Sequence, residues 1–280
     1  MGLKAEGNFP YTLNSVLMTQ SRPKQEIEIR HCATLSEYDE CVGVEHATWG
    51  EEISIPSAIF VVAHHTGGQV IGAFDGSSGS RMVGFTVALV GVRAGKPFLH
   101  SHMTAVLPEF RNRGVGRRLK LFQRQDALRR GLSWIEWTFD PLDLKNAHFN
   151  FVRLGAVARR YIPNCYGVTP SPLHAGLPTD RLVAEWVLDS DRVKAILADN
   201  PIPLRNPSAR VGIPANIAEI RERDQTAAAR VQDQTREEFR KWFGKGYVAT
   251  GVERRGDTVE YVLEREGAIA GLSFPRMNED

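Results

Sequence analysis

The sequence predicts an α/β (α+β) fold organised in three parts. Between residues 26 and 188, segments with the two-residue alternation of strands and segments with the helical spacing of apolar residues follow in the order β-α-α-β-β-β-α-β-α-β. The chain has 280 residues, of which 42% are hydrophobic, so it can bury a sizeable core. We expect an N-terminal arm at 1–24, a main domain at 25–190, and a C-terminal helical and β-hairpin extension at 191–280.

Four strands and two helices are predicted in the first part of the main domain. Thr34 or Ser36 caps a helix that runs to about residue 48, and Glu37 completes a capping box if Thr34 is the cap. Pro56 begins a second short helix, because proline is favoured at the first helical position. Alternation between turn-forming segments predicts strands at 26–31, 69–75, 81–92 and 98–106.

The second part of the chain opens with a long basic helix. Gly114 and Gly116 mark its start and Gly131 its end. The remaining elements are, in chain order, a strand at 133–139, an amphipathic helix at 142–154, an irregular segment at 164–178, a strand at 181–188, a short helix at 191–198, a proline-containing linker at 200–214, one long helix at 215–243, and a hairpin of 246–252 with 258–263.

Composition excludes several classes of protein. A net charge of +2 argues against general nucleic-acid binding. The sequence contains no run of about 18 apolar residues, so no membrane helix is predicted. The three cysteines, Cys32, Cys41 and Cys165, show no metal-ligand spacing and are expected to be free thiols in a reducing compartment. Adjacent His64 and His65 on a helix do not face one site, so no metal is expected. The beginning of the sequence lacks a signal peptide pattern, and we expect a cytoplasmic protein.

The segment at the start of the basic helix has the chemistry of a diphosphate site. Glycine lets a ligand approach the backbone closely, and the first N–H groups of a helix have no partner within it. Four cations surround these donors, namely Arg111, Arg113, Arg117 and Arg118. A tight connection with a solvated arginine face is the alternative, because Gly-x-Gly is a short motif.

Residues 111–116, with the sequence RNRGVG, match the Arg/Gln-x-x-Gly-x-Gly/Ala loop of the GCN5-related N-acetyltransferase (GNAT) superfamily. The preceding residues 104–110, TAVLPEF, resemble the strand that leads into this loop. The resemblance implies a GNAT fold, which is a mixed, mostly antiparallel sheet, splayed near its middle, with helices on both faces. It also implies that the strand, loop and helix bind acetyl-CoA or another acyl-CoA.

The resemblance extends to the residues that contact the coenzyme. Backbone groups on the splayed strand bind the pantetheine arm, and the loop amides bind the pyrophosphate. Asn146 resembles an asparagine of the family that contacts the coenzyme. The implied coenzyme-binding residues are Thr104, Val106, Arg111, Arg113, Gly114, Val115, Gly116, Arg117 and Asn146.

His100 is the predicted general base. In the histone-modifying branch of the family a glutamate stands fourteen positions before the first loop glycine, and His100 occupies that position here. An imidazole titrates near working pH, which suits the role. Strand alternation places His100, His102, Thr104 and Val106 on one face. Glu136 and Glu51 are reserve candidates.

The predicted general acid departs from the family pattern. The tyrosine of many members corresponds to Phe151, which has no proton to give. Tyr166 or Tyr161 could replace it, or water could protonate the thiolate. Either tyrosine could equally be a packed aromatic residue with a bonded hydroxyl.

Together these features predict an acyl-CoA-dependent N-acyltransferase that moves an acetyl (or succinyl) group to the amine of a small molecule. Length, residues 139–156 and the C-terminal helix resemble a bacterial subgroup that N-acylates (succinylates) amino acids. Arg81 and Arg93 are the cations available for a succinyl carboxylate. A protein N-acetyltransferase with an open acidic groove and a non-catalytic acyl-CoA sensor are the alternatives. The extension is expected to pack on the main domain, as a lid, or on a second copy in a homodimer.

Overall fold

The computed structural model describes residues 27–51, 54–78, 80–167, 176–200 and 209–269, and the predicted arm at 1–24 lies outside them. The strands are β1 (Ile27–His31), β2 (Gln69–Asp75), β3 (Arg81–Arg93), β4 (Lys96–Val106), β5 (Trp134–Phe139), β6 (Val157–Ile162), β7 (Arg181–Val187), β8 (Ala209–Pro214), β9 (Tyr247–Arg255) and β10 (Thr258–Arg265). The helices are α1 (Leu35–Trp49), α2 (Ser57–His65), α3 (Val115–Arg129), α4 (Leu144–His148), α5 (Asp191–Leu197), α6 (Ile217–Arg223) and α7 (Gln225–Phe243).

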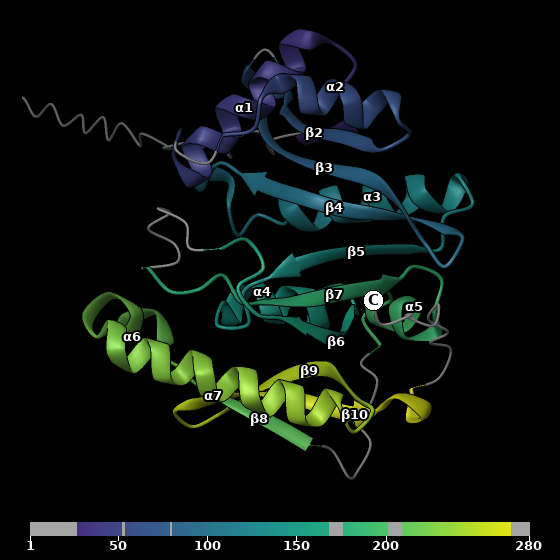
Figure 1. The fold of residues 1–280 in the computed structure, drawn as a ribbon. Coiled ribbons are helices and arrows are strands. Elements are labelled where there is room, and N and C mark those ends of the chain that lie inside the picture. The colour runs from purple at the N-terminus through teal and green to yellow at the C-terminus, as the bar shows by residue number, and fades with distance from the viewer. Residues whose placement is uncertain (1–26, 52–53, 79, 168–175, 201–208, 270–280) are drawn as a thin grey trace, which may run out of the picture.

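All ten described strands form one sheet, in the order β1-β2-β3-β4-β5-β7-β6-β9-β10-β8 (Figure 1). Neighbouring strands are antiparallel except β4 and β5, which run parallel. The predicted mixed, mostly antiparallel sheet is therefore confirmed. Among the described helices, none is long and apolar enough to cross a membrane.

Helices cover both faces of the sheet, as the side chains of β3 show. Phe85 packs against Phe60 of α2 with ring centroids 5.6 Å apart. The next residue, Thr86, contacts Gln123 of α3. Because successive residues of a strand point to opposite faces, α2 and α3 lie on opposite sides. We call these sides the α2 face and the α3 face.

The sheet is forked between β4 and β5. Only two residue pairs join these strands, Leu99 with Ile135 and His100 with Glu136. Beyond these pairs both strands continue, β4 to Val106 and β5 to Phe139, without pairing to one another. The fork is the splay that the resemblance implies. It leaves the facing backbone groups of both strands available to a ligand.

A β-bulge at the fork overturns the predicted alternation of β4. Met103 pairs with Val87 and Ser101 with Ala88, so His102 is an extra residue without a cross-strand partner. Thr104 and Val106 consequently share the α3 face with Ser101, whereas His100 lies on the α2 face. The expectation that His100, Thr104 and Val106 share one face is wrong, because alternation counts residues and a bulge adds one.

Local signals placed several boundaries well. Thr34 caps α1, and Glu37 accepts a hydrogen bond from the backbone N–H of Thr34, so the capping box is confirmed. Pro56 is the N-cap of α2 rather than its first residue. The C-terminal hairpin is confirmed as β9 and β10, with a shorter turn at Gly256 and Asp257 than predicted.

Three elements differ from the predictions. β6 was not predicted, because Arg159 and Arg160 interrupt its apolar pattern, and both pair with the buried Glu185. β8 lies within the predicted linker and pairs with β10. The predicted long helix is divided at Asp224, whose side chain accepts from the N–H of Ala227 and caps α7.

The C-terminal elements extend the same sheet. Ala158 of β6 pairs with Ala249 of β9, and α7 packs on β6, β8 and β9 (Figure 1). One hydrophobic cluster contains Trp186 of β7 together with Phe239 and Tyr261 of the extension. Burial of these large side chains makes the hairpin part of the main core.

Candidate functional site

The loop between β4 and α3 presents backbone donors. Gly114 is the N-cap of α3 in a left-handed conformation (φ 79°), and Asn112 is also left-handed (φ 60°). The first amide bonded back along the helix is that of Arg118, which donates to the Gly114 carbonyl at 3.0 Å. The N–H groups of the preceding residues, among them Val115 and Gly116, are therefore free of the helix ladder.

Open space adjoins these amides. A Cβ atom built on Gly116 meets only Val106 Cγ2, at 3.9 Å, and one built on Gly114 meets nothing within 4 Å. Packing within the protein therefore does not demand glycine at position 116. A ligand that must approach the backbone closely would require glycine at this position.

The four loop arginines differ in the contacts that their side chains make. Arg118 donates to the Ile27 carbonyl of β1, and Arg111 Nε donates to the Val106 carbonyl at 3.0 Å. Arg113 stands over the Phe110 ring, 5.4 Å from its centroid. Arg117 is half-buried, and no described residue forms a hydrogen bond with its Nε. Arg117 is thus the cation best placed to turn toward an anion at the start of α3.

Thr104 and Val106, the predicted pantetheine contacts, line the open edge of β4 beside this loop. Thr104 Oγ1 lies 2.8 Å from Thr86 Oγ1 on the α3 face. Val106 is the nearest neighbour of Gly116. Both predicted contacts therefore lie between the loop and the fork.

His100 lies at the fork, with Glu136 beside it. His100 is the last residue of β4 paired to β5, and its Nδ1 lies 3.7 Å from Glu136 Oε1. Its side chain is 31% exposed, so it can reach solvent or a substrate. Glu136 also binds Arg93 through two hydrogen bonds of 2.5 and 2.9 Å, and it binds Arg160. The carboxylate is thus held rigidly next to the predicted base.

Glu136 keeps its charge to low pH. Burial alone would raise its pKa, but the contact from His100, the hydrogen bonds from Arg93 and the charge of Arg160 together lower the pKa to about 2. A glutamate in an unfolded chain titrates near pH 4.3. Its ionised form therefore stabilises the fold above about pH 5, and this contribution is lost as pH falls toward 2.

Replacing Glu136 by glutamine is expected to lower the free energy of unfolding by about 3 kcal/mol at pH 7. The deficit should shrink as pH falls from 5 to 3, because the wild-type carboxylate is then being protonated. Urea unfolding at several pH values measures it. Glu253→Gln, which removes a more exposed ion pair with Arg210, is the control and should cost less than about 1 kcal/mol. A deficit for Glu136→Gln that is constant with pH would contradict this assignment.

The two candidate tyrosines have different surroundings. Tyr166 is 50% exposed, and its hydroxyl lies 2.7 Å from Thr138 Oγ1 on β5. Thr138 is two residues beyond Glu136, so Tyr166 and His100 occupy the same face of the sheet. Tyr161 donates its hydroxyl to the buried Asp180 at 2.6 Å, and burial together with this partner raises its pKa. Of the two, Tyr166 has the more accessible hydroxyl.

The remaining candidates, Phe151, Asn146 and Arg81, have other surroundings. Phe151 is fully buried in a π-helical turn that follows α4. Asn146 belongs to the first turn of α4, where its N–H donates to the Asp143 side chain at 3.0 Å. Arg81 pairs with Glu109 on the surface. Among the described residues, no group of three or more histidine, cysteine or acidic side chains could hold a metal ion.

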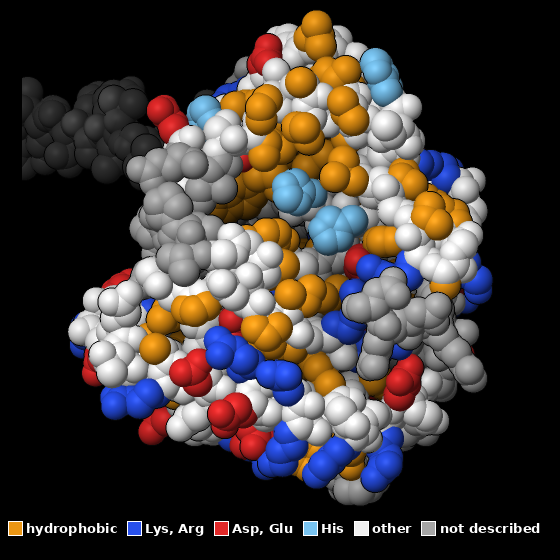
Figure 2. All heavy atoms as spheres, in the orientation of Figure 1, with side chains coloured by type: hydrophobic (Ala, Val, Ile, Leu, Met, Phe, Trp, Pro, Cys, Tyr) orange, Lys and Arg blue, Asp and Glu red, His pale blue; other side chains and the backbone are white. Residues whose placement is uncertain are grey.

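A hollow lies in the middle of the molecular surface (Figure 2). It separates the part that carries α1 and α2 from the part that carries α7, and hydrophobic side chains form its floor. Two neighbouring histidine side chains lie at its wall. His100 and His102 of β4, which borders this hollow, have ring centroids 6.4 Å apart.

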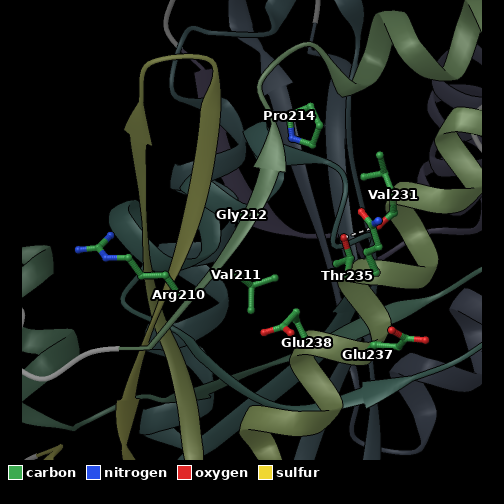
Figure 3. A pocket seen from close by; sticks show the side chains of 9 residues that line it. Arg210, Val211, Gly212, Pro214, Val231, Thr235, Glu237 and Glu238 are labelled. Carbon is green, nitrogen blue, oxygen red and sulfur yellow. Dashed lines mark hydrogen bonds between the residues drawn. The ribbon is translucent and has the colours of Figure 1, made fainter.

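A second depression, of about 450 Å³, lies between β8 and α7. In Figure 3, Thr235 and Glu238 of α7 face Val211 of β8 across it, and Arg210 points away. Arg210 is occupied by Glu253 and Glu260. The lining contains neither a histidine nor a cysteine, so the fork remains the better candidate for chemistry.

Sequence reasoning missed the partners that surround the fork. Arg160 lies on the unpredicted β6, and Glu136 was only a reserve candidate for the base. The sequence pattern also did not predict a site at Lys120, a buried lysine of α3. The helical spacing could have indicated its burial. Lys120 is three residues before Gln123 and seven before Ala127, so it shares a helix face with these two buried residues.

Several solved structures of acetyltransferases resemble part of the chain. The ribosomal-protein-S18-alanine N-acetyltransferase from Escherichia coli is 14% identical, covering 58% of this chain and 94% of that chain (TM-score 0.46). The NatC complex bound to Gag peptide and CoA is 14% identical over 58% and 98% (TM-score 0.46). An aminoglycoside acetyltransferase from an uncultured soil metagenomic sample, in complex with sisomicin, is 19% identical over 44% and 84% (TM-score 0.39). No family model and no curated protein sequence matches the chain. Likeness at this level assigns neither a reaction nor a substrate.

Proposed function

We propose that this chain is a GNAT-type N-acyltransferase that uses acetyl-CoA or another acyl-CoA as a substrate. The observation that carries the proposal is the set of free amides at the start of α3, with open space over Gly116, directly beside the fork between β4 and β5. The RNRGVG motif, read as a coenzyme loop, predicts such a cradle at this position.

The proposed placement of the coenzyme follows the chain. The amides of Val115 and Gly116, with Arg117, hold the pyrophosphate, and the unpaired edge of β4 holds the pantetheine amides. From Val106 to Ser101 the strand advances about 17 Å, which is the scale of an extended pantetheine arm. The thioester would then lie near the fork, next to His100.

In this placement His100 removes the proton from the attacking amine. Glu136, beside Nδ1, favours the tautomer that carries its proton on Nδ1 and leaves Nε2 free to act as the base. Tyr166, whose hydroxyl contacts Thr138 on the same face of the sheet, is the predicted hydroxyl donor on this side. The acyl group passes directly to the nitrogen, because a thioester is already activated.

A small amine, such as an amino acid, is the proposed acceptor. Hydrophobic and histidine side chains are visible in the hollow (Figure 2). Glu136, the carboxylate beside His100, is already paired with Arg93 and Arg160, so it is not free to bind a basic peptide, and this favours a small amine. Arg93, a candidate for a succinyl carboxylate, already binds Glu136.

Calorimetric titration with acetyl-, succinyl- and free CoA, followed by thiol release with a panel of amines, tests the proposal. We expect micromolar binding and acceptor-dependent thiol release. Binding without release for any acceptor would instead support the acyl-CoA sensor. Absence of binding would mean that residues 111–116 form only a connection.

Replacing Arg117 by glutamine is expected to raise the Kd for CoA about tenfold, because a charge-assisted hydrogen bond contributes about 1.5–3 kcal/mol. Arg129→Gln, at the other end of the same helix, is the matched control and should leave Kd unchanged. Calorimetry at constant ionic strength measures both. Equal losses in the two variants would indicate a general charge effect rather than a phosphate contact.

A further inference from the structure

The side chain of Lys120 lies against the fork on the α3 face of the sheet. Its Nζ donates to Ser101 Oγ at 2.7 Å and lies 4.1 Å from the centroid of the Trp137 ring. Ser101 and Trp137 are the residues that directly follow the last paired positions of β4 and β5. The ammonium group therefore lies where the two strands separate.

Lys120 is buried, and the described part of the chain offers it no counter-ion. It is 3% exposed, and among the described residues its other polar contact is Gln123 Oε1 at 3.1 Å, a neutral group. The groups that face it from β4, α3 and β5 are Ser101, Gln123 and Trp137, and none is a carboxylate. Burial lowers its pKa to about 7, so it can both hold and release a proton near neutral pH. Burying a lysine in this setting costs free energy of folding, which makes Lys120 a candidate for a functional role.

A second polar group at the same place lacks a partner. Asn150, which is 1% exposed, accepts from Trp137 Nε1 at 3.2 Å. Its Nδ2 is buried and has no hydrogen-bond partner among the residues that the structure describes. Lys120 and the Asn150 amide thus both contact Trp137 at the fork, and an electron-rich ligand atom there would satisfy both groups.

The two faces of the fork carry complementary groups. His100 and Glu136 lie on the α2 face, whereas Ser101 and Trp137, one residue further along each strand, turn to the α3 face with Lys120. If His100 deprotonates the amine on the α2 face, the amine attacks the thioester carbon from that side. The sulfur then leaves toward the α3 face, where Lys120 lies.

We propose that Lys120 is a catalytic residue that stabilises and protonates the departing thiolate, in place of the tyrosine that Phe151 replaces. This inference rests on the proposed N-acyltransferase function. The amine nitrogen bonds to the carbonyl carbon, the carbon–sulfur bond breaks, and sulfur leaves with the electron pair. His100 takes the proton of the amine, and the Lys120 ammonium gives a proton to sulfur, directly or through the Ser101 hydroxyl. Solvent then returns His100 and Lys120 to their starting states.

The test compares wild type with Lys120→Met, which preserves length and removes the charge. The full chain is saturated with free CoA, and the ultraviolet absorbance of the thiolate is followed against pH. We expect the thiol of CoA bound to wild type to have a pKa at least one unit below that in Lys120→Met. The kcat of Lys120→Met should fall at least tenfold at pH 7. Its thermal stability should not fall, because a buried charge without a counter-ion is removed.

The controls separate this inference from the function on which it rests. Lys194→Met removes an exposed lysine and should change neither the thiol pKa nor kcat. Tyr166→Phe should leave the thiol pKa unchanged. If Lys120→Met does not fold, Lys120→Gln serves in the same titration. Equal thiol pKa values with and without the lysine, in protein that binds CoA, would overturn the role of Lys120 alone. Failure of wild type to bind CoA would overturn the proposed function as well.

Discussion

Replacing His100 by glutamine is expected to lower kcat for acyl transfer by about 10²- to 10³-fold, with the Kd for CoA unchanged. Glutamine keeps the polar character of the side chain but cannot take a proton. His100 is the half-exposed histidine at the fork, held beside a carboxylate that stays ionised. Thiol release at saturating acceptor, measured against pH, gives the result. The limb of the wild-type pH profile due to the base should disappear in the variant.

His102→Gln is the matched control for this experiment. His102 lies on the same strand, and its ring is 6.4 Å from that of His100. It is the bulged residue and does not pair with β3. We expect a change in kcat of less than about threefold, far below a typical general-base effect. A loss as large in His102→Gln as in His100→Gln would reassign the base.

Replacing Gly116 by leucine is expected to weaken CoA binding at least a hundredfold without lowering the stability of the protein. The backbone of Gly116 is helical, and leucine is favoured over glycine within a helix by roughly 0.5–1 kcal/mol. Its side chain would occupy the open space beside Val106, where the diphosphate is proposed to bind. Calorimetry gives the affinity, and urea unfolding gives the free energy of unfolding.

Gly43→Leu provides the comparison. Gly43 lies within α1, and a Cβ atom there meets nothing within 4 Å, so the substitution changes helix propensity alone. Both variants should be at least as stable as wild type, and only Gly116→Leu should lose CoA. If Gly116→Leu binds CoA normally, the start of α3 is not the coenzyme site.

Local sequence patterns predicted most of the helices and strands. The capping box at Thr34 and Glu37, the glycine start of α3 and the C-terminal hairpin were predicted because each depends on residues close in sequence. β6 was missed because Arg159 and Arg160 break its apolar pattern, and their buried partner Glu185 lies on another strand. A charged strand becomes recognisable only when its counter-ions are known.

Some features of the candidate site were likewise predicted from the sequence, whereas others depend on the tertiary structure. The sequence by itself determined the strand, loop and helix around RNRGVG, and the resemblance carried by this motif predicted the mixed sheet. It also made His100 the predicted base. Only the tertiary structure decided that β4 bulges at His102 and so turns Thr104 to the face opposite His100. It alone placed Lys120 between Ser101 and Trp137, where its described neighbours include no carboxylate. The physical reason is range: helix caps and turns depend on neighbouring residues, whereas register, burial and counter-ions depend on which distant strands meet.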